Sequence, residues 1–593
     1  MKYAWIALLG MMGCASGASG EAGETAGLDD EWGMDGPISP TPPISAQDGE
    51  LRRGLWVATD TTRTQVWTAR NKWEDTSTPA ARAAGLAWAT DSGLDWDAKF
   101  SAWVASLAWI PSVDRTAPPF GGAAGRGHAP AVAGDEMTVA LTTPWGKTLP
   151  SPMLECAELS LFLRITFAAW YELPLVLEAQ DARGQRLYFG HNGVRTTAGR
   201  YARSPEFAIQ YRDFTRTGGA AWPSDAVLAG KRIAGGEDDQ PELADGAHFG
   251  AYLDAIHRNK RAGYFTVMVL DYLGSANLAD PANAYNLAPD AVRPGDFLIE
   301  RWQRVGIGHT LVVKDVEALP GGSKDVTTIS GSMPRRQGVR ESGQASKGYF
   351  TSEYTGGPGK NSDGDAYARL GGGAKRWRVA KNIAGYWTNT WMAGDEASWI
   401  NSTDLARIAA RPARFEQILG QVAPAQQRAE LVAQVAEARQ HLARFPASCS
   451  ARERRERAFA ALYELSERAF GETVAEVDAR ERVLDDYVFA ALDYAHARTC
   501  CWDSSTSAMH DIIMDGARAD AAAAEAARTC AAPVVFKSYA DGYQRWASRA
   551  AALGRAADWR AWSEDEGCPQ RAMAVDAEAP DAATPYCALD PAP

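Results

Sequence analysis

Apolar positions in the stretch 156–170 recur with the period of a helix. The first stripe uses residues 159, 162, 163, 167 and 170, and residues 161, 165 and 168 fill much of the other side. The pattern predicts a helix that is buried nearly all round, begins after Ser151-Pro152 and ends before Pro174. Cys156 then lies near the amino end of this helix.

A second pattern, typical of strands, follows downstream. Arg293-Pro294-Gly295-Asp296 reads as a turn that leads into the apolar run Phe297-Leu298-Ile299. The next apolar run begins at His309, and a turn at 320–323 separates it from a third run over 326–333. We expect a hairpin here, folded so that Ser330 to Ser332 lie near His309.

The remaining pattern divides the chain into a mixed part and a helical part. Residues 94–110 and 248–260 predict helices, 137–141 and 187–193 predict strands, and 265–273 fits either. From about residue 401 Gly becomes rare, and periodic stretches at 404–419, 424–444, 451–469, 473–497 and 536–552 predict helices. We therefore expect an α+β domain over 51–400 and an all-α domain over 401–593.

The amino terminus has the pattern of an export signal. One Lys precedes a short apolar run that ends in Gly13-Cys14, which is too short to span a bilayer as a stable helix. Its end resembles a bacterial lipoprotein signal, which implies that Cys14 is lipidated and that the protein is exported to the cell envelope, at the outer membrane. An ordinary cleaved signal is the alternative. Residues 15–50 carry no Lys or Arg, are rich in acidic residues, Gly and Pro, and read as a disordered tether.

Composition narrows the class of partner. The chain has 593 residues with 46% hydrophobic residues and 21 Trp, enough for two or three domains with sizeable cores. Its net charge of −13 argues against nucleic acid as a partner and against electrostatic adhesion to anionic lipid. We expect contact with a membrane only through the lipid anchor.

Cys156 and His309 are the candidate reactive pair. A helix dipole favours negative charge at its amino end, so a thiol there tends to ionise. A Cys at a helix start and a His opening a distant strand together suit thiol nucleophilic catalysis. A buried core cysteine and a structural histidine are the alternatives.

These residues resemble the papain-like fold, and most of all the NlpC-type cell-wall peptidases. That family has an acidic residue and Cys opening a helix, then Pro-Gly-Asp with an apolar strand, then His with a second one. The chain has Glu155-Cys156-Ala157, then Pro294-Gly295-Asp296, then His309-Thr310. The bacterial transglutaminase-like enzymes are an alternative resemblance, because the helix runs into Leu173-Pro174, but they explain Pro-Gly-Asp less well.

The resemblance implies a cysteine peptidase or amidase that cleaves an amide bond. Cys156 is then the nucleophile, His309 the base, and the substrate a peptide, first of all a peptidoglycan stem peptide. Papain-like enzymes orient the imidazole with a polar residue on the following strand, a role that falls here to Ser332, or to Ser330. The helix and sheet patterns and the resemblance together give a papain-like α+β domain, with residues 175–290 as an insertion.

The other cysteines gather in the helical part. Six remain after Cys14 and Cys156, namely Cys449, Cys500, Cys501, Cys530, Cys568 and Cys587. In an exported protein three disulfides are expected among them, and six cysteines allow fifteen pairings. No metal-binding spacing of His and Cys occurs, so we expect no catalytic zinc and no cofactor.

Two functions therefore stay open. The first is an envelope-anchored cysteine hydrolase that uses Cys156 and His309. The second is a non-catalytic envelope lipoprotein that keeps a papain-like or transglutaminase-like fold as a binding or scaffolding module. The reactivity of the Cys156 thiol separates the two.

Overall fold

The computed structural model divides the chain into two compact units, Met1–Gly420 and Gln421–Pro593. It describes residues 52–559 except 58–62, 70–94, 113–136, 182, 197, 203, 218–222, 234–247, 305–307, 320–321, 332–334, 362–363, 384, 391–394, 421–423, 445, 447–448, 490–506 and 530–539. The proposed signal at 1–14 and the tether at 15–50 lie outside these residues. The division falls after residue 420, later than the expected boundary at 400.

The first unit mixes helices and strands, consistent with the expected α+β class. Its largest sheet is antiparallel throughout, and β4 (Thr148–Pro150) pairs with β3 beside it. The strand order is β19 (Trp399–Ile400), β10 (Ala284–Leu287), β16 (Gly373–Trp377), β11 (Phe297–Glu300), β12 (His309–Ala318), β13 (Lys324–Ser330), β15 (Val339–Glu341), β3 (Met137–Thr142) and β2 (Ala108–Pro111).

Three smaller sheets surround this one. One has the order β1 (Arg52–Val57), β18 (Tyr386–Thr390) and β17 (Val379–Ile383), and a second pairs β14 (Arg336–Gln337) with β5 (Met153–Leu154). The third runs β6 (Val176–Gln180), β7 (Arg186–Gly190), β8 (Gly193–Thr196) and β9 (Gly199–Arg200). The predicted strand and turn at 187–193 is thus the β7–β8 hairpin.

One face of the large sheet is covered by α4 (Cys156–Trp170). The helix ends before Pro174 as predicted, but it begins only at Cys156, because the residues after Pro152 form the short strand β5. Its side chains are buried on almost every side because both its stripes are apolar. The helices packed in the same core are α3 (Trp96–Ser106), α7 (Phe249–Ile256), α8 (Lys260–Tyr272) and α9 (Ser275–Ala279). The short helices α5 (Phe207–Gln210) and α6 (Ala226–Ala229) lie beside α8 and α7.

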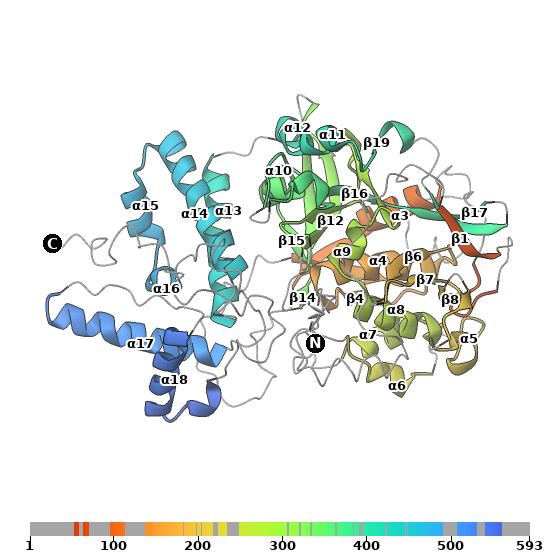
Figure 1. Ribbon diagram of the computed structural model, residues 1–593, viewed down its shortest axis with the longest axis horizontal. Coiled ribbons are helices and arrows are strands. Elements are labelled where there is room, and N and C mark those ends of the chain that lie inside the picture. The colour runs from red at the N-terminus through yellow and green to blue at the C-terminus, as the bar shows by residue number, and fades with distance from the viewer. Residues whose placement is uncertain are drawn as a thin grey trace, which may run out of the picture. The chain divides into compact units, whose positions relative to one another are not determined.

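The opposite face of the sheet is covered by α10 (Gly343–Thr351) and α12 (Arg411–Ile418). The rings of Phe350 of α10 and Phe415 of α12 lie 4.6 Å apart between centroids, tilted by 47°, and pack on β11, β12 and β13. The short helix α11 (Leu405–Ala409) precedes α12. The strands β11 to β13 are therefore buried between α4 on one side and α10 on the other (Figure 1).

The Pro-Gly-Asp turn is built for structural reasons. Gly295 has φ of 86°, a left-handed conformation that favours glycine, and a Cβ there would lie 3.0 Å from the Phe100 ring. Asp296 accepts the backbone N–H of Arg293 at 2.9 Å, which closes the turn. The same carboxylate is held by Arg376 of β16, at 2.7 Å from Nε and 2.9 Å from Nη2.

The second unit is helical in its described residues, as expected. Its helices are α13 (Pro424–Arg444), α14 (Cys449–Phe470), α15 (Val474–Glu481), α16 (Leu484–Val488), α17 (Ser507–Ala526) and α18 (Ala540–Ala552). One apolar core lies between α13, α14 and α15, and another between α13, α16, α17 and α18. The helix α17 falls where the sequence pattern predicted none.

Candidate functional site

Cys156 is the first residue of α4, where the helix meets the sheet. Its Sγ lies 3.7 Å from the carbonyl oxygen of Gly308, the residue before β12. The residue is of intermediate exposure. The thiol is therefore positioned against the backbone that leads into His309.

The surroundings of the sulfur favour the neutral thiol. Burial raises the pKa of the Cys156 thiol from 9.0 to about 12, although hydrogen bonding from the backbone N–H of Thr310 opposes the rise. The carboxylate of Glu155 adds to the increase, and the N–H of Ala157 opposes it. The sulfur consequently donates its proton toward Gly308, which is the reverse of the thiolate expected from the helix dipole alone.

A buried ion pair closes the amino end of α4. Glu158 accepts the backbone N–H of Glu155 at 2.8 Å, as an acidic third helical residue does in a capping box. Arg335 binds the same carboxylate with Nη2 at 2.8 Å and Nε at 3.0 Å. Both side chains are almost fully buried, so this pair fixes the segment after β13 to the helix start.

Two glycines near Cys156 lie where the backbone is closely packed, Gly308 against the end of β11 and Gly331 against the residues before α4. A Cβ on Gly308 would lie 2.5 Å from the carbonyl oxygen of Glu300 and 2.7 Å from Cδ of Arg301. The N–H of Gly308 donates to the Ser275 hydroxyl of α9 at 2.9 Å. A Cβ on Gly331 would lie 2.6 Å from the carbonyl oxygens of the residues just before Cys156. Neither position has room for a larger residue.

His309 lies on the other face of the sheet. Successive side chains of a strand point to opposite faces. Val312 packs in the core that contains α4, whereas Leu311 and Val313 pack with the residues of α10 and α12. By this alternation Thr310 shares the α4 face with Val312, and His309 shares the α10 face with Leu311.

Contacts across the ladder support this placement of His309. Its ring centroid lies 5.5 Å from that of Tyr349, a residue of α10. Its partner in β11 is the buried Glu300, and directly opposite residues of an antiparallel pair have adjacent side chains on one face. The structure therefore groups His309 with Glu300 and Tyr349, and it groups Cys156 with Gly308 and Thr310.

Ser332, or Ser330, is the residue predicted to orient the imidazole of His309. Ser332 lies outside the described residues. Ser330 pairs with Leu311 of β12, so the expected hairpin is confirmed, and it lies on the α10 face with Leu311. The Ser330 hydroxyl donates to Glu341 and accepts from Nη2 of Arg336 at 2.9 Å. That hydroxyl is thus engaged by Glu341 and Arg336.

The other predicted cysteines lie almost entirely outside the residues that the structure describes. Cys449 is the first residue of α14, but its side chain is not described, and Cys14, Cys500, Cys501, Cys530, Cys568 and Cys587 lie outside the described residues. Within the part of the chain that the structure describes, no cluster of His, Cys, Asp or Glu could hold a metal ion. In the same part, no helix is long and apolar enough to cross a bilayer.

Two neighbours of the candidate pair were missed by sequence reasoning. Thr310 follows His309 directly, and its backbone N–H hydrogen-bonds to the sulfur of Cys156. Glu300 ends β11 and becomes the neighbour of His309 only through the ladder register. An acidic residue at the end of an apolar strand, before a turn, is the one signal that pointed to Glu300.

Comparison of the chain with protein families, with characterised proteins and with solved structures gave no match. The function therefore has to be inferred from the residues themselves.

Proposed function

We propose that this protein is a non-catalytic envelope lipoprotein, which uses a domain of papain-like arrangement as a binding or scaffolding module. In this proposal Cys156 is a structural thiol and His309 belongs to the opposite side of the sheet. The ligand is a peptide or the peptide part of the cell wall, held without being cleaved. Lipidation of Cys14 keeps the module at the membrane.

The proposal is carried by the alternation of side chains along β12, from which we infer that the sheet separates the imidazole of His309 from Sγ of Cys156. A general base has to come within about 3 Å of the proton it removes, directly or through one water. The imidazole of His309 shares its face with Leu311 and approaches Tyr349, while Sγ of Cys156 approaches the backbone on the α4 face. A rotation of side chains alone does not move the imidazole across a buried strand.

The protonation of the thiol supports the same conclusion. A nucleophilic cysteine needs a lowered pKa, and burial raises that of Cys156 to about 12. The neighbouring Glu155 acts in the same direction. In this proposal the thiol is a protonated, partly exposed structural group that contacts the backbone leading into β12.

One observation favours the second candidate, a cysteine hydrolase. Cys156 is the first residue of a long central helix, and the N–H groups of Ala157 and Thr310 hydrogen-bond to its sulfur, which favours the thiolate form that a nucleophile needs. Peptidoglycan stem peptides are the substrate class that the resemblance suggests. This candidate requires a base other than His309 in the described geometry, or a different register of β12.

The rate of thiol alkylation separates the two candidates. The protein is treated with iodoacetamide at about pH 7.5, and modification of Cys156 is followed by peptide mapping. Raising the pKa from 9.0 to about 12 reduces the thiolate fraction about a thousandfold, and the higher nucleophilicity of a more basic thiolate offsets only part of this, so Cys156 should react much more slowly than an ordinary thiol. The control thiol is an Ile209→Cys variant, because Ile209 is 80% exposed.

Each candidate predicts a different result. The proposal expects slow labelling of Cys156 in the folded protein, full labelling in urea, and unchanged co-sedimentation of the Cys156→Ser variant with purified cell-wall sacculi. Labelling of Cys156 at about pH 6 that is faster than that of the control thiol contradicts the proposal and supports the hydrolase. A loss of that labelling in a His309→Ala variant would then identify the base.

A further inference from the structure

A histidine is built into the core of the second unit. His510 lies on the first turns of α17 and is 7% exposed. Its ring stacks on that of Phe489, with 5.1 Å between centroids and 11° between the planes. Met509 and Ile513, on the same helix, are fully buried in the core around it. The imidazole is therefore held in one place, away from bulk water.

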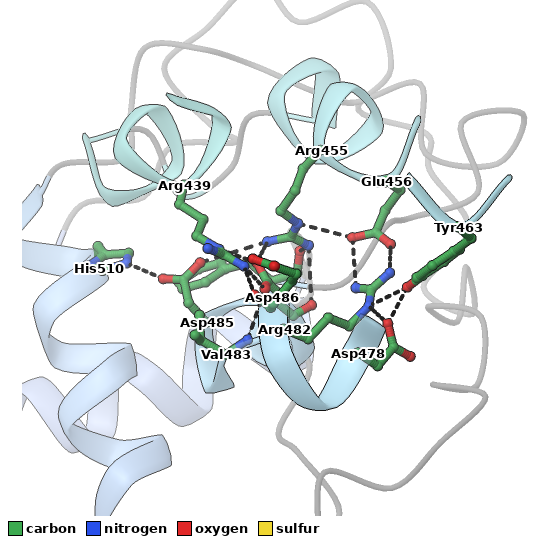
Figure 2. Close-up of polar contacts among 12 residues, drawn as sticks. Arg439, Arg455, Glu456, Tyr463, Asp478, Arg482, Val483, Asp485, Asp486 and His510 are labelled. Carbon is green, nitrogen blue, oxygen red and sulfur yellow. Dashed lines mark hydrogen bonds and ion pairs between the residues drawn. The ribbon is translucent and has the colours of Figure 1, made fainter. Parts of the chain in front are cut away.

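The ring is bound by a carboxylate of another helix. Nε2 of His510 lies 2.9 Å from Asp485 of α16, and this contact joins α17 to α16 (Figure 2). A weaker contact runs to Asp511 on the same helix, with 3.8 Å between Nδ1 and the carboxylate. Asp511 is 42% exposed, so water screens this second contact more strongly.

The neighbouring carboxylate shows why Asp485 depends on His510. Asp486 accepts Nε of Arg439 at 2.9 Å and the N–H of Val483 at 3.0 Å, and Arg455 lies 3.2 Å from it. Asp485 has Arg455 only at 3.7 Å. Figure 2 shows the side chains of Arg439 and Arg455 turned toward Asp486, whereas His510 reaches Asp485 from the other side. The imidazole is thus the nearest cationic group that the described residues offer to Asp485.

The charged groups around His510 come from every helix packed near it. The described ones are Asp485 and Asp486 of α16, Asp511 of α17, Arg439 of α13, Arg452 and Arg455 of α14, and Arg555, which donates to the carbonyl oxygen of Ala508. The arginines oppose protonation of the imidazole. Arg439 and Arg455 bind mainly to Asp486. Asp485, which contacts the imidazole, therefore has the weaker arginine contact.

We propose that His510 and Asp485 form a pH-dependent link, which holds α17 to the rest of the helical unit when the imidazole is protonated and loosens when it is neutral. The link joins two segments that the chain connects only through residues 490–506. A charge-assisted hydrogen bond is about twice as strong as a neutral one, so loss of the proton weakens this junction selectively. The inference is independent of the function of the first unit.

The direction of the pH dependence follows from the pKa. Burial lowers the pKa of His510, but the hydrogen bond to Asp485 and the negative charges of Asp485 and Asp511 outweigh it, and the pKa lies above the ordinary 6.5. The folded form thus binds the proton more tightly than the unfolded form. The stabilisation is fully present below the unfolded pKa and is lost as the pH rises through the folded pKa.

The pKa of His510 is measured first in the wild-type full chain. Exchange of the imidazole C2 proton for deuterium is followed by mass spectrometry over a series of pH values. We expect a pKa above the ordinary value for His510, and a value below it in the Asp485→Asn variant, because burial then dominates. The matched control is Asp511→Asn, which removes the distant, exposed carboxylate and should leave most of the shift.

Backbone hydrogen exchange then tests the junction itself. In wild type, peptides from α17 should lose protection as the pH rises from about 6 to about 8.5, after correction for intrinsic exchange. Each unit by which the folded pKa exceeds the unfolded one appears as about a tenfold change in the opening equilibrium. The His510→Gln variant keeps a hydrogen-bonding side chain and should show no such pH dependence.

Peptides from α4 serve as the internal reference, and they should behave identically in all variants. A His510 pKa at or below the ordinary value in wild type overturns the proposal without any variant. Equal pH dependence of α17 protection in wild type and His510→Gln also overturns it.

Discussion

Replacing Asp296 by Asn tests the structural role of the Pro-Gly-Asp turn. Asp296 is 2% exposed and Arg376 is 2% exposed, and the two are joined by bonds of 2.7 and 2.9 Å. Asn keeps the size of the side chain and one acceptor oxygen but removes the charge. The guanidinium of Arg376 then remains charged inside the unit.

The magnitude follows from the partners left to Arg376. Breaking a buried ion pair by removing one partner costs about 3–5 kcal/mol. Arg376 retains Asp395 at 2.9 Å and Asp97 at 4.0 Å, which compensate part of its charge. We therefore expect a loss of about 3 kcal/mol, the lower end of the range, in the free energy of unfolding of the first unit.

The assay is equilibrium unfolding in urea, followed by tryptophan fluorescence. The control is Asp290→Asn, which breaks the ion pair with Arg414 at 2.6 Å. In that pair the two side chains are 46% and 59% exposed, so water and salt already screen the interaction and the loss should be small. Equal losses in the two variants would refute the structural role of Asp296.

Two further predictions concern the helix start and the anchor. Gly308→Ala should destabilise the first unit by about 1–3 kcal/mol in the same urea titration, because the added Cβ collides with Glu300 and Arg301. The control is Gly348→Ala on α10, where a Cβ meets nothing within 4 Å, and this variant should be neutral or slightly stabilising. Cys14→Ser should release the protein from the detergent phase in a partition experiment, because the acyl chains are lost, and unchanged partition would exclude lipidation at Cys14.

The elements with one clear period were predictable from the sequence. The helix 156–170 has two apolar stripes and a Pro soon after its end, and α4 lies over this stretch, although it begins after β5 and not at Pro152. The hairpin of β12 and β13 follows from two apolar runs around a Pro-Gly turn. The helix α17 was missed, although its first turns carry the buried apolar residues Met509, Ile512 and Ile513 and its alanine-rich remainder favours helices.

The geometry of the candidate site could not be predicted in the same way. The strand β11 and the first half of β12 are buried on both faces, so their side chains form largely apolar runs that do not reveal which face each residue occupies. The sequence therefore placed His309 on a strand but not on a side of the sheet. The partner of Asp296, Arg376, lies 80 residues away and becomes its neighbour only through the sheet order.

The alternation along β12 has a consequence for how motifs are recognised. Thr310 lies on the face of Cys156 and His309 on the other, and the two residues are neighbours in the chain. Exchanging their identities would bring an imidazole to the thiol without changing the order of Cys, Pro-Gly-Asp and His. A pattern that records only residue order and approximate spacing gives both arrangements the same score. For residues on buried strands, odd or even position relative to the core is part of the motif, because a shift of one position moves a side chain to the opposite face of the sheet.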